Sequence, residues 1–449
     1  MTSYLTFYIL FSPETAPKKI LRNIAFVVLM ALVLTPISWA GENIAEGEAA
    51  NPSIEQAALS QKAVRTGLDV LIAKNFQPLA GKRVGLITNP TGIASNGDST
   101  VQVFQKAGNF KLVALFGPEH GVYGDQIAGG YVPSIRDPRT GLQAFSLYSK
   151  TRKPTPEMLK GIDVLVYDIQ DIGVRSYTYI STMGLAMEAA GEAGIEFMVL
   201  DRPNPLGGER VEGPGVDPGY VSFVSQWPVP YVYGMTCGEL AQMLIGEKWI
   251  KKAPKLTVIP MEGWKRSMPW EETGLRWVPT SPHIPTAETA IYYAITGWMG
   301  ELLVISNGVG YPQPFVLVGA PEVKADTFAK AMNAFQLEGL WFRPAYYKSF
   351  YTNFKDVICG GVQIYCNTLK NTHLTGAGIY LLEELMRETG RNFFAEAKKE
   401  QVSMFDSSSG SDRIRKAVLA KTPAQEIVAS WKNFEETFKT KRQPYLLYP

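Results

Sequence analysis

The sequence predicts an α/β fold built on an open parallel sheet, and two observations support this. Strand-like and helix-like segments alternate regularly between about residues 57 and 205, which is typical of βα repeats and therefore of parallel strands. Short apolar runs, such as 112–116, also end abruptly at Gly, Pro or charged residues. Runs bounded in this way indicate strands that are buried on both faces of a sheet.

The expected elements can be placed along the chain. Helix-like segments are expected at 57–75, 99–107 and 178–193, and strands at 83–88, 111–116, 163–168 and 196–200. Further elements are expected at 236–247 (a helix capped by Thr236 and Glu239), 255–260 (a strand), 423–438 (a helix) and 445–448 (a last strand). The connection from 117 to 160 is long, and long loops on such sheets usually serve a site.

Two domains are expected after the N-terminal region, because the remaining chain is too long for one compact domain. Gly and Pro are dense between residues 203 and 235, and such a composition indicates a crossing between domains. We therefore expect a first α/β domain at 57–215 and a second at 216–449.

Residues 1–40 resemble a secretory signal peptide. Basic residues at 18, 19 and 22 precede an apolar stretch at 24–34, and Ser38 and Ala40 fit a cleavage site before Gly41. This stretch is short for a membrane span, and an uncleaved N-terminal anchor is the alternative. We expect a linker at 41–56 and an exported protein, periplasmic or secreted, that keeps no membrane span after cleavage.

The composition narrows the class of partner. Without residues 1–40, the chain carries 41 basic and 41 acidic residues, so nucleic acid is not an expected partner. The three cysteines are Cys237, Cys359 and Cys366. An oxidising compartment would permit a bridge between Cys359 and Cys366, and buried free thiols are the alternative.

Polar side chains follow four of the predicted strands. Because the carboxyl ends of parallel strands share one edge of a sheet, and ligands bind outside that edge, we expect these side chains to form one site. The residues expected there are Asn89, Glu119, His120, Asp168, Gln170, Asp171, Arg175, Tyr177, Tyr179, Asp201, Arg202 and Asn204.

Glu119 and His120 come directly after the run at 112–116 and are flanked by Gly117 and Gly121. A carboxyl that is half-buried in an apolar crevice has a raised pKa, which suits proton donation to a leaving oxygen. The alternative is a pair of loop residues that only hydrogen-bonds the turn.

The segment 168–179 gathers two carboxylates, an amide, a guanidinium and two tyrosines at one strand end. Tyrosine rings can stack on the C–H face of a sugar while carboxylates and amides bind hydroxyl groups, so this segment favours a sugar site. The alternative is a structural pair of Asp and Arg with the tyrosines in the core.

Metal binding is a second possibility, because Glu119, His120, Asp168 and Asp171 could converge as ligands. The chain has only three histidines, however, and none shows ligand spacing. No G-x-G-x-x-G, P-loop or nucleophile-elbow motif follows a strand, which disfavours nucleotide binding and serine hydrolase chemistry. We expect neither a cofactor nor a resident metal.

Several motifs together resemble the exo-β-N-acetylmuramidase family of peptidoglycan hexosaminidases, and the similarity covers nearly the whole chain after residue 56. The matching stretches are 89–92 (Asn-Pro-Thr-Gly), 116–121 (Phe-Gly-Pro-Glu-His-Gly), 148 with 152–155, 168–179, 200–205, 211–214 and 234–240.

This resemblance implies a Rossmann-like N-terminal domain joined to a second α/β domain, with the active site in the cleft between them. It also implies release of terminal N-acetylmuramic acid from cell-wall glycan fragments. Glu119 falls on the family's Pro-Glu-His-Gly position and is expected to supply the catalytic carboxyl, with His120, Asp168 and Asp171 around it. Arg175 or Arg202 is the expected partner of the lactyl carboxylate of the sugar.

The second half departs from the family pattern. At residues 280–286, relatives usually read Pro-Ser-Pro-Asn-Met-Pro-Thr, and this chain has His283 in place of the Asn. In the next motif the first residue, Glu301, is kept. Where relatives have Asn, Glu and Arg, however, this chain has Val304, Asn307 and Val309. We expect His283 and Glu301 to contact substrate. The changes allow a shift in sugar specificity or a glycan-binding protein that has lost hydrolysis.

Overall fold

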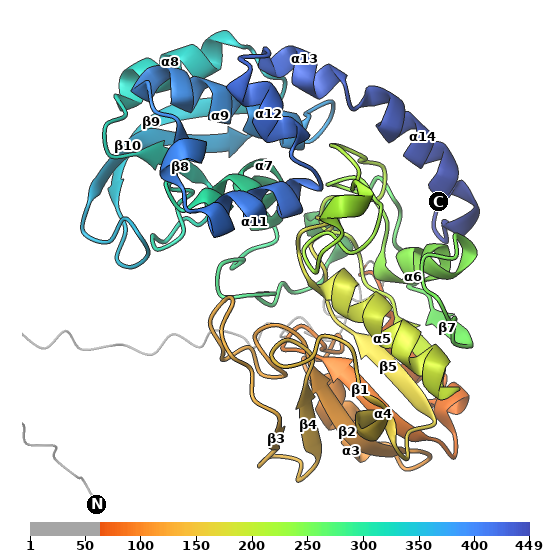
Figure 1. Ribbon diagram of the computed structural model, residues 1–449. Coiled ribbons are helices and arrows are strands. Elements are labelled where there is room, and N and C mark those ends of the chain that lie inside the picture. The colour runs from red at the N-terminus through yellow and green to blue at the C-terminus, as the bar shows by residue number, and fades with distance from the viewer. Residues whose placement is uncertain (1–62) are drawn as a thin grey trace, which may run out of the picture. The chain divides into compact units, whose positions relative to one another are not determined.

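The computed structural model describes residues 63–449, so the signal peptide and linker expected at 1–40 and 41–56 lie outside the described residues. The described strands form a seven-stranded sheet, ordered β3-β4-β2-β1-β5-β6-β7, and a three-stranded sheet, ordered β8-β10-β9 (Figure 1). The strands are β1 (Arg83–Thr88), β2 (Lys111–Gly117), β3 (Ile135–Arg136), β4 (Gln143–Ser146), β5 (Val164–Asp168), β6 (Glu196–Leu200), β7 (Leu256–Ile259), β8 (Leu317–Ala320), β9 (Leu340–Lys348) and β10 (Ile358–Cys366).

The larger sheet confirms the predicted parallel α/β fold. All of its strands run parallel except β3, which pairs antiparallel with β4 at the edge. Counted along the chain, the parallel strands have the spatial order 3-2-1-4-5-6, which is the Rossmann order. The order reverses between β1 and β5, where Thr88 lies opposite Asp168.

Helices cover both faces of this sheet, and strand residues alternate between the two faces. Residues such as Leu86 and Val166 face α2 (Gly67–Ala73) and α3 (Thr100–Lys106). Residues such as Ile87 and Tyr167 face α4 (Pro156–Leu159), α5 (Tyr179–Ala193) and α6 (Cys237–Gly246). Helices α2, α3 and α6 each begin with a capping box, which satisfies backbone N–H groups that the first turn leaves free.

The smaller sheet is antiparallel throughout, and the helices of the second half pack around it. The largest apolar cluster joins β8 and β10 to residues of these helices. They are α7 (Thr289–Thr296), α8 (Ala325–Ala334), α9 (Leu374–Thr389), α10 (Phe393–Glu396), α11 (Lys399–Ser409), α12 (Arg413–Leu419) and α13 (Ala424–Ala429). The last helix, α14 (Lys432–Arg442), instead places Phe438 in the apolar cluster of the larger sheet. Short 3-10 segments are η1 (Gln77–Leu79), η2 (Pro218–Tyr220), η3 (Trp270–Thr273), η4 (Trp298–Leu302) and η5 (Gln443–Tyr445).

The structure differs from the sequence predictions in several elements. The connection 117–160 contains β3, β4 and α4, although the sequence predicts a loop there. The expected C-terminal helix is two helices, α13 and α14, and the tail 445–448 forms no strand. Instead, the Tyr448 ring packs against Val64, Met261 and Trp264. Strand β7 joins the larger sheet beside β6, so that sheet continues beyond the boundary predicted at residue 215.

The possible bridge between Cys359 and Cys366 does not form, and both thiols are free. The two residues lie at opposite ends of β10, where they pair with Tyr347 and Leu340 of β9. They are seven steps apart along the extended strand, or about 24 Å, which is far beyond the reach of a disulfide. Cys359 is buried and serves as a small apolar side chain.

Candidate active site at the carboxyl ends of the strands

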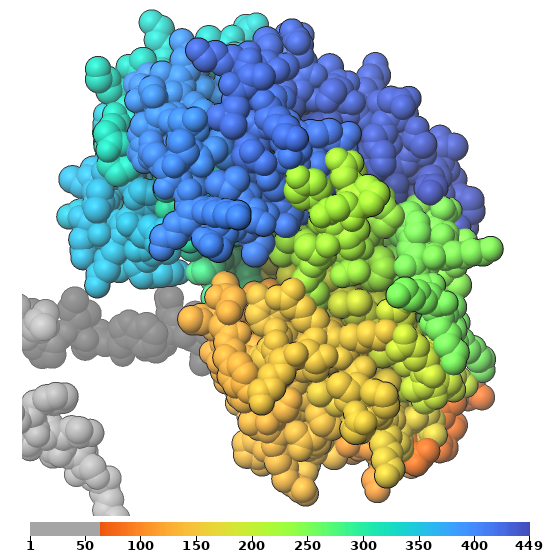
Figure 2. All heavy atoms as spheres, in the orientation of Figure 1, coloured from red at the N-terminus to blue at the C-terminus, as the bar shows by residue number. Residues whose placement is uncertain are grey.

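A cavity of about 450 Å³ lies beyond the carboxyl end of β2, within the size range of small-molecule sites. The larger sheet contributes the loop after β2 and the residues that precede α5, and the second half of the chain contributes the remaining walls. Figure 2 shows these halves, orange to yellow-green and cyan to blue, packed against each other. Of the expected site residues, the cavity brings together Glu119, His120, Tyr177, His283 and Glu301.

Glu119 follows β2 and is held by two hydrogen bonds. The Gly129 N–H donates to Oε1 at 3.0 Å, and the Thr178 hydroxyl donates to Oε2 at 2.8 Å. Thr178 is the N-cap residue of α5, so the positive end of that helix also lies close to this carboxyl.

His120 is buried and adopts a left-handed backbone conformation, with φ of 70°. This conformation is uncommon outside glycine and costs free energy that neighbouring structure must offset. Its ring Nδ1 lies 2.8 Å from the carbonyl oxygen of Gln126, which fixes the orientation of the ring. The imidazole therefore forms a fixed part of the cavity wall next to Glu119.

Glu301, in η4, is the second carboxyl group of the cavity. Its side chain is partly buried and shares the cavity wall with apolar residues that include Ile305 and Phe315. Burial raises the pKa of Glu301 to about 7, and the negative charge of the nearby Glu119 contributes in the same direction. Glu301 is thus the carboxyl that retains its proton closer to neutral pH.

Tyrosine residues also contribute to the site. Tyr148 lines the cavity; burial raises its pKa, and the negative charge of Glu119 raises it further. The Tyr177 hydroxyl donates to Thr280 Oγ1 at 2.7 Å. Tyr179, which the sequence also predicts at the site, is buried with its hydroxyl donating to the Thr280 carbonyl, so of these two tyrosines Tyr177 alone lines the cavity.

His283 lines the opposite wall, where its Nε2 lies 2.9 Å from the Tyr351 hydroxyl. Burial lowers the pKa of His283, and the neighbouring His120 lowers it further. No Lys or Arg lines this cavity within the described part of the chain. Val309, the position where relatives usually carry Arg, contributes an apolar side chain to the wall instead.

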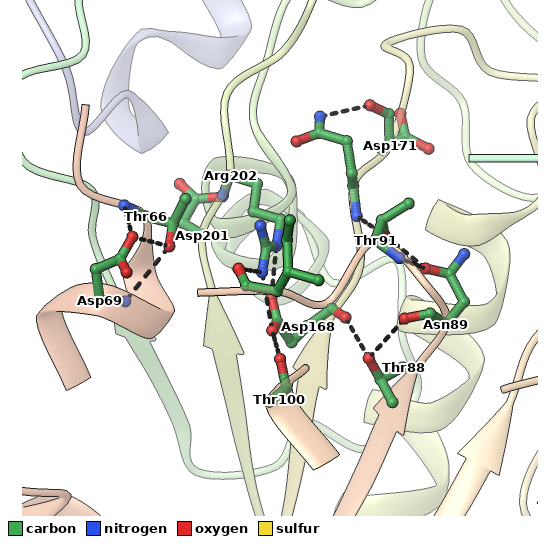
Figure 3. A network of polar contacts seen from close by, with 12 residues as sticks. Thr66, Asp69, Thr88, Asn89, Thr91, Thr100, Asp168, Asp171, Asp201 and Arg202 are labelled. Carbon is green, nitrogen blue, oxygen red and sulfur yellow. Dashed lines mark hydrogen bonds and ion pairs between the residues drawn. The ribbon is translucent and has the colours of Figure 1, made fainter. Parts of the chain in front are cut away.

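Asp168 and Arg202 do not reach this cavity, contrary to the sequence prediction. Arg202 binds Asp168 through Nε at 2.6 Å and Nη2 at 3.0 Å, and the Thr100 hydroxyl donates to the same carboxylate (Figure 3). Both side chains are buried. The pair is structural, because both charges are matched inside the protein, but the partner of Asp168 is Arg202 and not an arginine within 168–179 as in the alternative expected from the sequence.

Asp171 and Asp201 also lie outside the cavity lining. The Tyr233 hydroxyl and the Gly173 N–H donate to Asp171, while burial raises its pKa to about 6. Asp201 accepts from Thr236, Gly238 and Tyr448, and burial raises its pKa to about 6. These hydrogen bonds join the strand ends to later segments, so both carboxyls serve the fold.

The remaining amides stabilise loops. Asn89 Oδ1 accepts from the N–H and hydroxyl of Thr91, and Asn204 bonds to the backbone of Leu206 and Met235. Gln170 donates to the carbonyls of Asp171 and Pro203. Gln170 and Arg202 face a separate cavity of about 540 Å³.

Arg175, the other expected anion partner, is fully buried. Its guanidinium donates to the carbonyls of Pro214, Val229 and Ser408, at 2.6 to 3.1 Å. None of these acceptors is a carboxylate, and burial lowers the pKa of Arg175 to about 10. The side chain therefore connects two loops and helix α11 and does not line the cavity.

Several cavity residues were identified from the sequence only in part or not at all. Glu301 was expected as a substrate contact without a chemical role, and Tyr148 stood out only within a family motif. Thr352, Asn353 and Phe354 come from the loop between β9 and β10 and carry no sequence signal. Across residues 63–449, no group of three His, Cys, Asp or Glu side chains could hold a metal ion.

Two carboxyl groups in different environments within one cavity are the arrangement that glycoside hydrolases use, one as acid and the other as anion. The fold and this pair therefore define a glycoside hydrolase. The chain belongs to the exo-β-N-acetylmuramidase NamZ family: its N-terminal model matches residues 84–288 and its C-terminal model matches residues 291–448.

Comparisons with individual proteins agree with this family membership. The chain is 41% identical over 399 residues to the peptidoglycan β-N-acetylmuramidase NamZ of Bacillus subtilis, covering 89% of this chain and 95% of the relative. Two DUF1343 family proteins of Bacteroides fragilis have similar crystal structures. The first has a TM-score of 0.82 and 48% sequence identity, and the match covers 86% of this chain and 100% of that chain. The second has a TM-score of 0.67 and 28% sequence identity, and the match covers 86% of this chain and 99% of that chain.

Proposed function

We propose that this enzyme releases N-acetylmuramic acid, or a related amino sugar, from the non-reducing end of peptidoglycan fragments. The observation that carries the chemistry is the pairing of Glu119 and Glu301 in one cavity. The substrate class rests on the Bacillus subtilis relative, which is a peptidoglycan β-N-acetylmuramidase.

The surroundings of the two carboxyls favour an assignment opposite to the one expected from the sequence. Glu301, with its pKa raised to about 7, acts as the general acid that protonates the glycosidic oxygen. Glu119, held by Thr178 and the Gly129 N–H, acts as the carboxylate that stabilises positive charge at the anomeric carbon. His120 and Tyr148 complete the wall beside Glu119.

The partner of the lactyl carboxylate also differs from the expected arginines. Arg175 and Arg202 are engaged elsewhere, and the described cavity lining offers only His120 and His283 as groups able to carry positive charge. An imidazole binds an anion less firmly than a bidentate guanidinium. We therefore expect weaker discrimination between N-acetylmuramic acid and N-acetylglucosamine than an arginine at position 309 would give.

Export is part of the proposal. Residues 1–40 carry the signal-peptide pattern, and no helix within residues 63–449 has the length and apolar character needed to cross a membrane. We propose that the mature enzyme acts on cell-wall fragments in the periplasm or outside the cell. Expression with and without residues 1–40, followed by cell fractionation, tests this: both forms remaining in the cytoplasm would reject it.

The function itself is tested with a disaccharide of N-acetylmuramic acid and N-acetylglucosamine. Wild type should release both monosaccharides, and the release should persist in EDTA. Saturable binding without release would support the glycan-binding alternative, and loss of activity in EDTA would support a metal-dependent hydrolase. Thr389→Ser, on the helix α9, is a suitable control variant because its hydroxyl bonds within that helix.

A further inference from the structure

An exposed aromatic surface lies at the rim of the cavity. The loop 349–357, between β9 and β10, contributes Thr352, Asn353 and Phe354 to the cavity wall. The residues just before them, Phe350 and Tyr351, are 64% and 50% exposed. Large apolar groups that remain exposed next to a cavity usually mark a binding surface.

Contacts with the segment 303–311 fix this loop in position. The Phe350 N–H donates to the Gly310 carbonyl, and Asn353 Nδ2 donates to the Leu303 carbonyl, both at 2.8 Å. Gly310 has a φ of +93°, and a Cβ there would lie 2.4 Å from the Tyr351 carbonyl oxygen. This close approach places the loop directly against the wall that carries Glu301 and Val309.

The rings extend outward from the cavity in two stacked pairs. The Tyr351 ring stacks on His283, which lines the cavity, with centroids 6.1 Å apart and planes at 23°. The Phe350 ring stacks on Tyr311, with centroids 6.0 Å apart and planes at 26°. Because backbone contacts hold the loop, these rings are oriented before any ligand binds, which limits the entropy lost on binding.

We propose that Tyr311, Phe350 and Tyr351 form an aromatic platform that binds sugar units beyond the first one on the leaving-group side of the scissile bond. The inference rests on the proposed function and adds that the preferred substrate is a glycan longer than a disaccharide. The platform is continuous with the cavity through His283. Flat rings match the C–H face of a pyranose, and such contacts do not require charge.

Chain-length dependence of kcat/KM tests the platform. The probes are the disaccharide above and the tetrasaccharide made of two such units. Wild type should cleave the tetrasaccharide about five- to tenfold more efficiently, as expected for an added aromatic contact. Phe350→Ala should abolish that advantage while leaving hydrolysis of the disaccharide within about twofold.

Trp341→Ala provides the matched control. Trp341 is 46% exposed on the same hairpin, but it pairs with Tyr365 at the other end of β9 and β10. This variant should keep the full chain-length advantage. Equal efficiencies of wild type on both substrates, or the same loss in both variants, would overturn the inference.

Binding measurements separate this inference from the proposed hydrolysis. In calorimetry, Glu119→Gln should bind the tetrasaccharide, and adding Phe350→Ala should weaken binding about five- to tenfold, whereas adding Trp341→Ala should not. If wild type hydrolyses neither sugar but this pattern holds, the proposed function fails and the platform stands. If Phe350→Ala instead abolishes self-association of wild type on gel filtration and leaves sugar binding intact, the platform is a contact between copies of the chain.

Discussion

Glu119 and Glu301 share a cavity but differ in their surroundings. Glu119 accepts two hydrogen bonds and lies by the N-terminus of α5, and Glu301 meets an apolar wall and the charge of Glu119. Burial and that charge raise the pKa of Glu301 to about 7. The two carboxyls are therefore chemically distinct although they share one cavity.

The raised pKa of Glu301 predicts a pH-dependent change in stability for Glu301→Gln. Its native pKa is about 7, against 4.5 ordinarily, so the folded protein loses stability as pH rises from about 4.5 to 7. The variant has no such titration. Its free energy of unfolding, compared with that of wild type, should therefore be up to about 3 kcal/mol more favourable at pH 8 than at pH 4. Urea unfolding at both pH values measures this difference.

Glu400→Gln, which alters an exposed carboxyl on α11, is the control for that experiment. If the stability of Glu301→Gln relative to wild type does not increase between pH 4 and pH 8, that result would contradict the buried, protonated state of Glu301.

The same pKa predicts the pH profile of activity. If Glu301 is the acid, kcat/KM should fall above about pH 7 as its proton is lost. Replacing Glu119 with Gln removes a nearby negative charge and should lower the pKa of Glu301. Carbon NMR titration of labelled glutamate in Glu119→Gln measures that shift, and an unchanged or higher pKa would show that the two carboxyls do not interact.

Val309 predicts a change in sugar preference. Val309→Arg adds a guanidinium to a cavity whose described lining has no Lys or Arg, so it should favour the sugar that carries a carboxylate. The ratio of kcat/KM for chromogenic N-acetylmuraminide over N-acetylglucosaminide should rise about tenfold, equivalent to about 1.4 kcal/mol. Val309→Gln, similar in length but uncharged, should leave the ratio within about twofold; a comparable rise in both variants would refute an ionic cause.

At the scale of elements, glycines position the loop that forms one wall of the cavity. Gly310→Ala should move this loop, because the added Cβ would meet the Tyr351 carbonyl at 2.4 Å. We expect a loss of about 1–3 kcal/mol in unfolding free energy together with a marked rise in KM. Gly141→Ala is the control, because Gly141 also has a positive φ but an added Cβ there would lie in open space. This variant should lose stability without a change in KM. Equal changes in KM for the two variants would contradict the role of the loop.

Elements with strong local patterns were predictable from the sequence. Strands β1, β2, β5 and β6 have apolar cores that end at Gly, Pro or charged residues, and α6 begins with the predicted capping box at Thr236 and Glu239. Strand β4 was missed because its four residues lie inside a long polar connection. The tail at 445–448 was apolar enough to dock, but it packs through Tyr448 and forms no strand.

The position of Glu119 was also predictable, because a buried strand ends just before it. Its partner Glu301 was expected at the site only from the family resemblance, because it comes from η4 in the second half of the chain and no spacing along the sequence shows that the two meet. Asp168, Asp171 and Arg175 were misplaced for a related reason. A strand end shows that polar groups are present, but whether they bind each other or a ligand depends on partners such as Arg202 and Tyr233.

At the scale of the whole molecule, buried arginines connect segments that are far apart in sequence. Arg175 binds carbonyls at Pro214, Val229 and Ser408. Arg442, near the end of α14, binds carbonyls at Gly208 and Gly234. Helix α14 lies close to α6 in Figure 1, where Tyr445 bonds to Glu247. The C-terminal helix thereby returns to the larger sheet.

Arg175→Gln should therefore destabilise the protein without changing specificity. Loss of the guanidinium leaves buried carbonyls unpaired, which should cost about 2–5 kcal/mol in unfolding free energy. Arg413→Gln, whose Arg is exposed and paired with Asp217, should cost less than about 1 kcal/mol. Thermal unfolding and KM for both chromogenic sugars check this; a selective rise in KM for the muraminide would return Arg175 to the anion-binding role.

The most direct test of the carboxylate pair is the rate at which N-acetylmuramic acid is released from its disaccharide with N-acetylglucosamine. Wild type should release the sugar, and Glu119→Gln and Glu301→Gln should each lose at least about a hundredfold in kcat, while Asp171→Asn, if folded, should retain most of its activity. Full activity in either glutamate variant would contradict the pairing of Glu119 with Glu301 as the catalytic carboxyls.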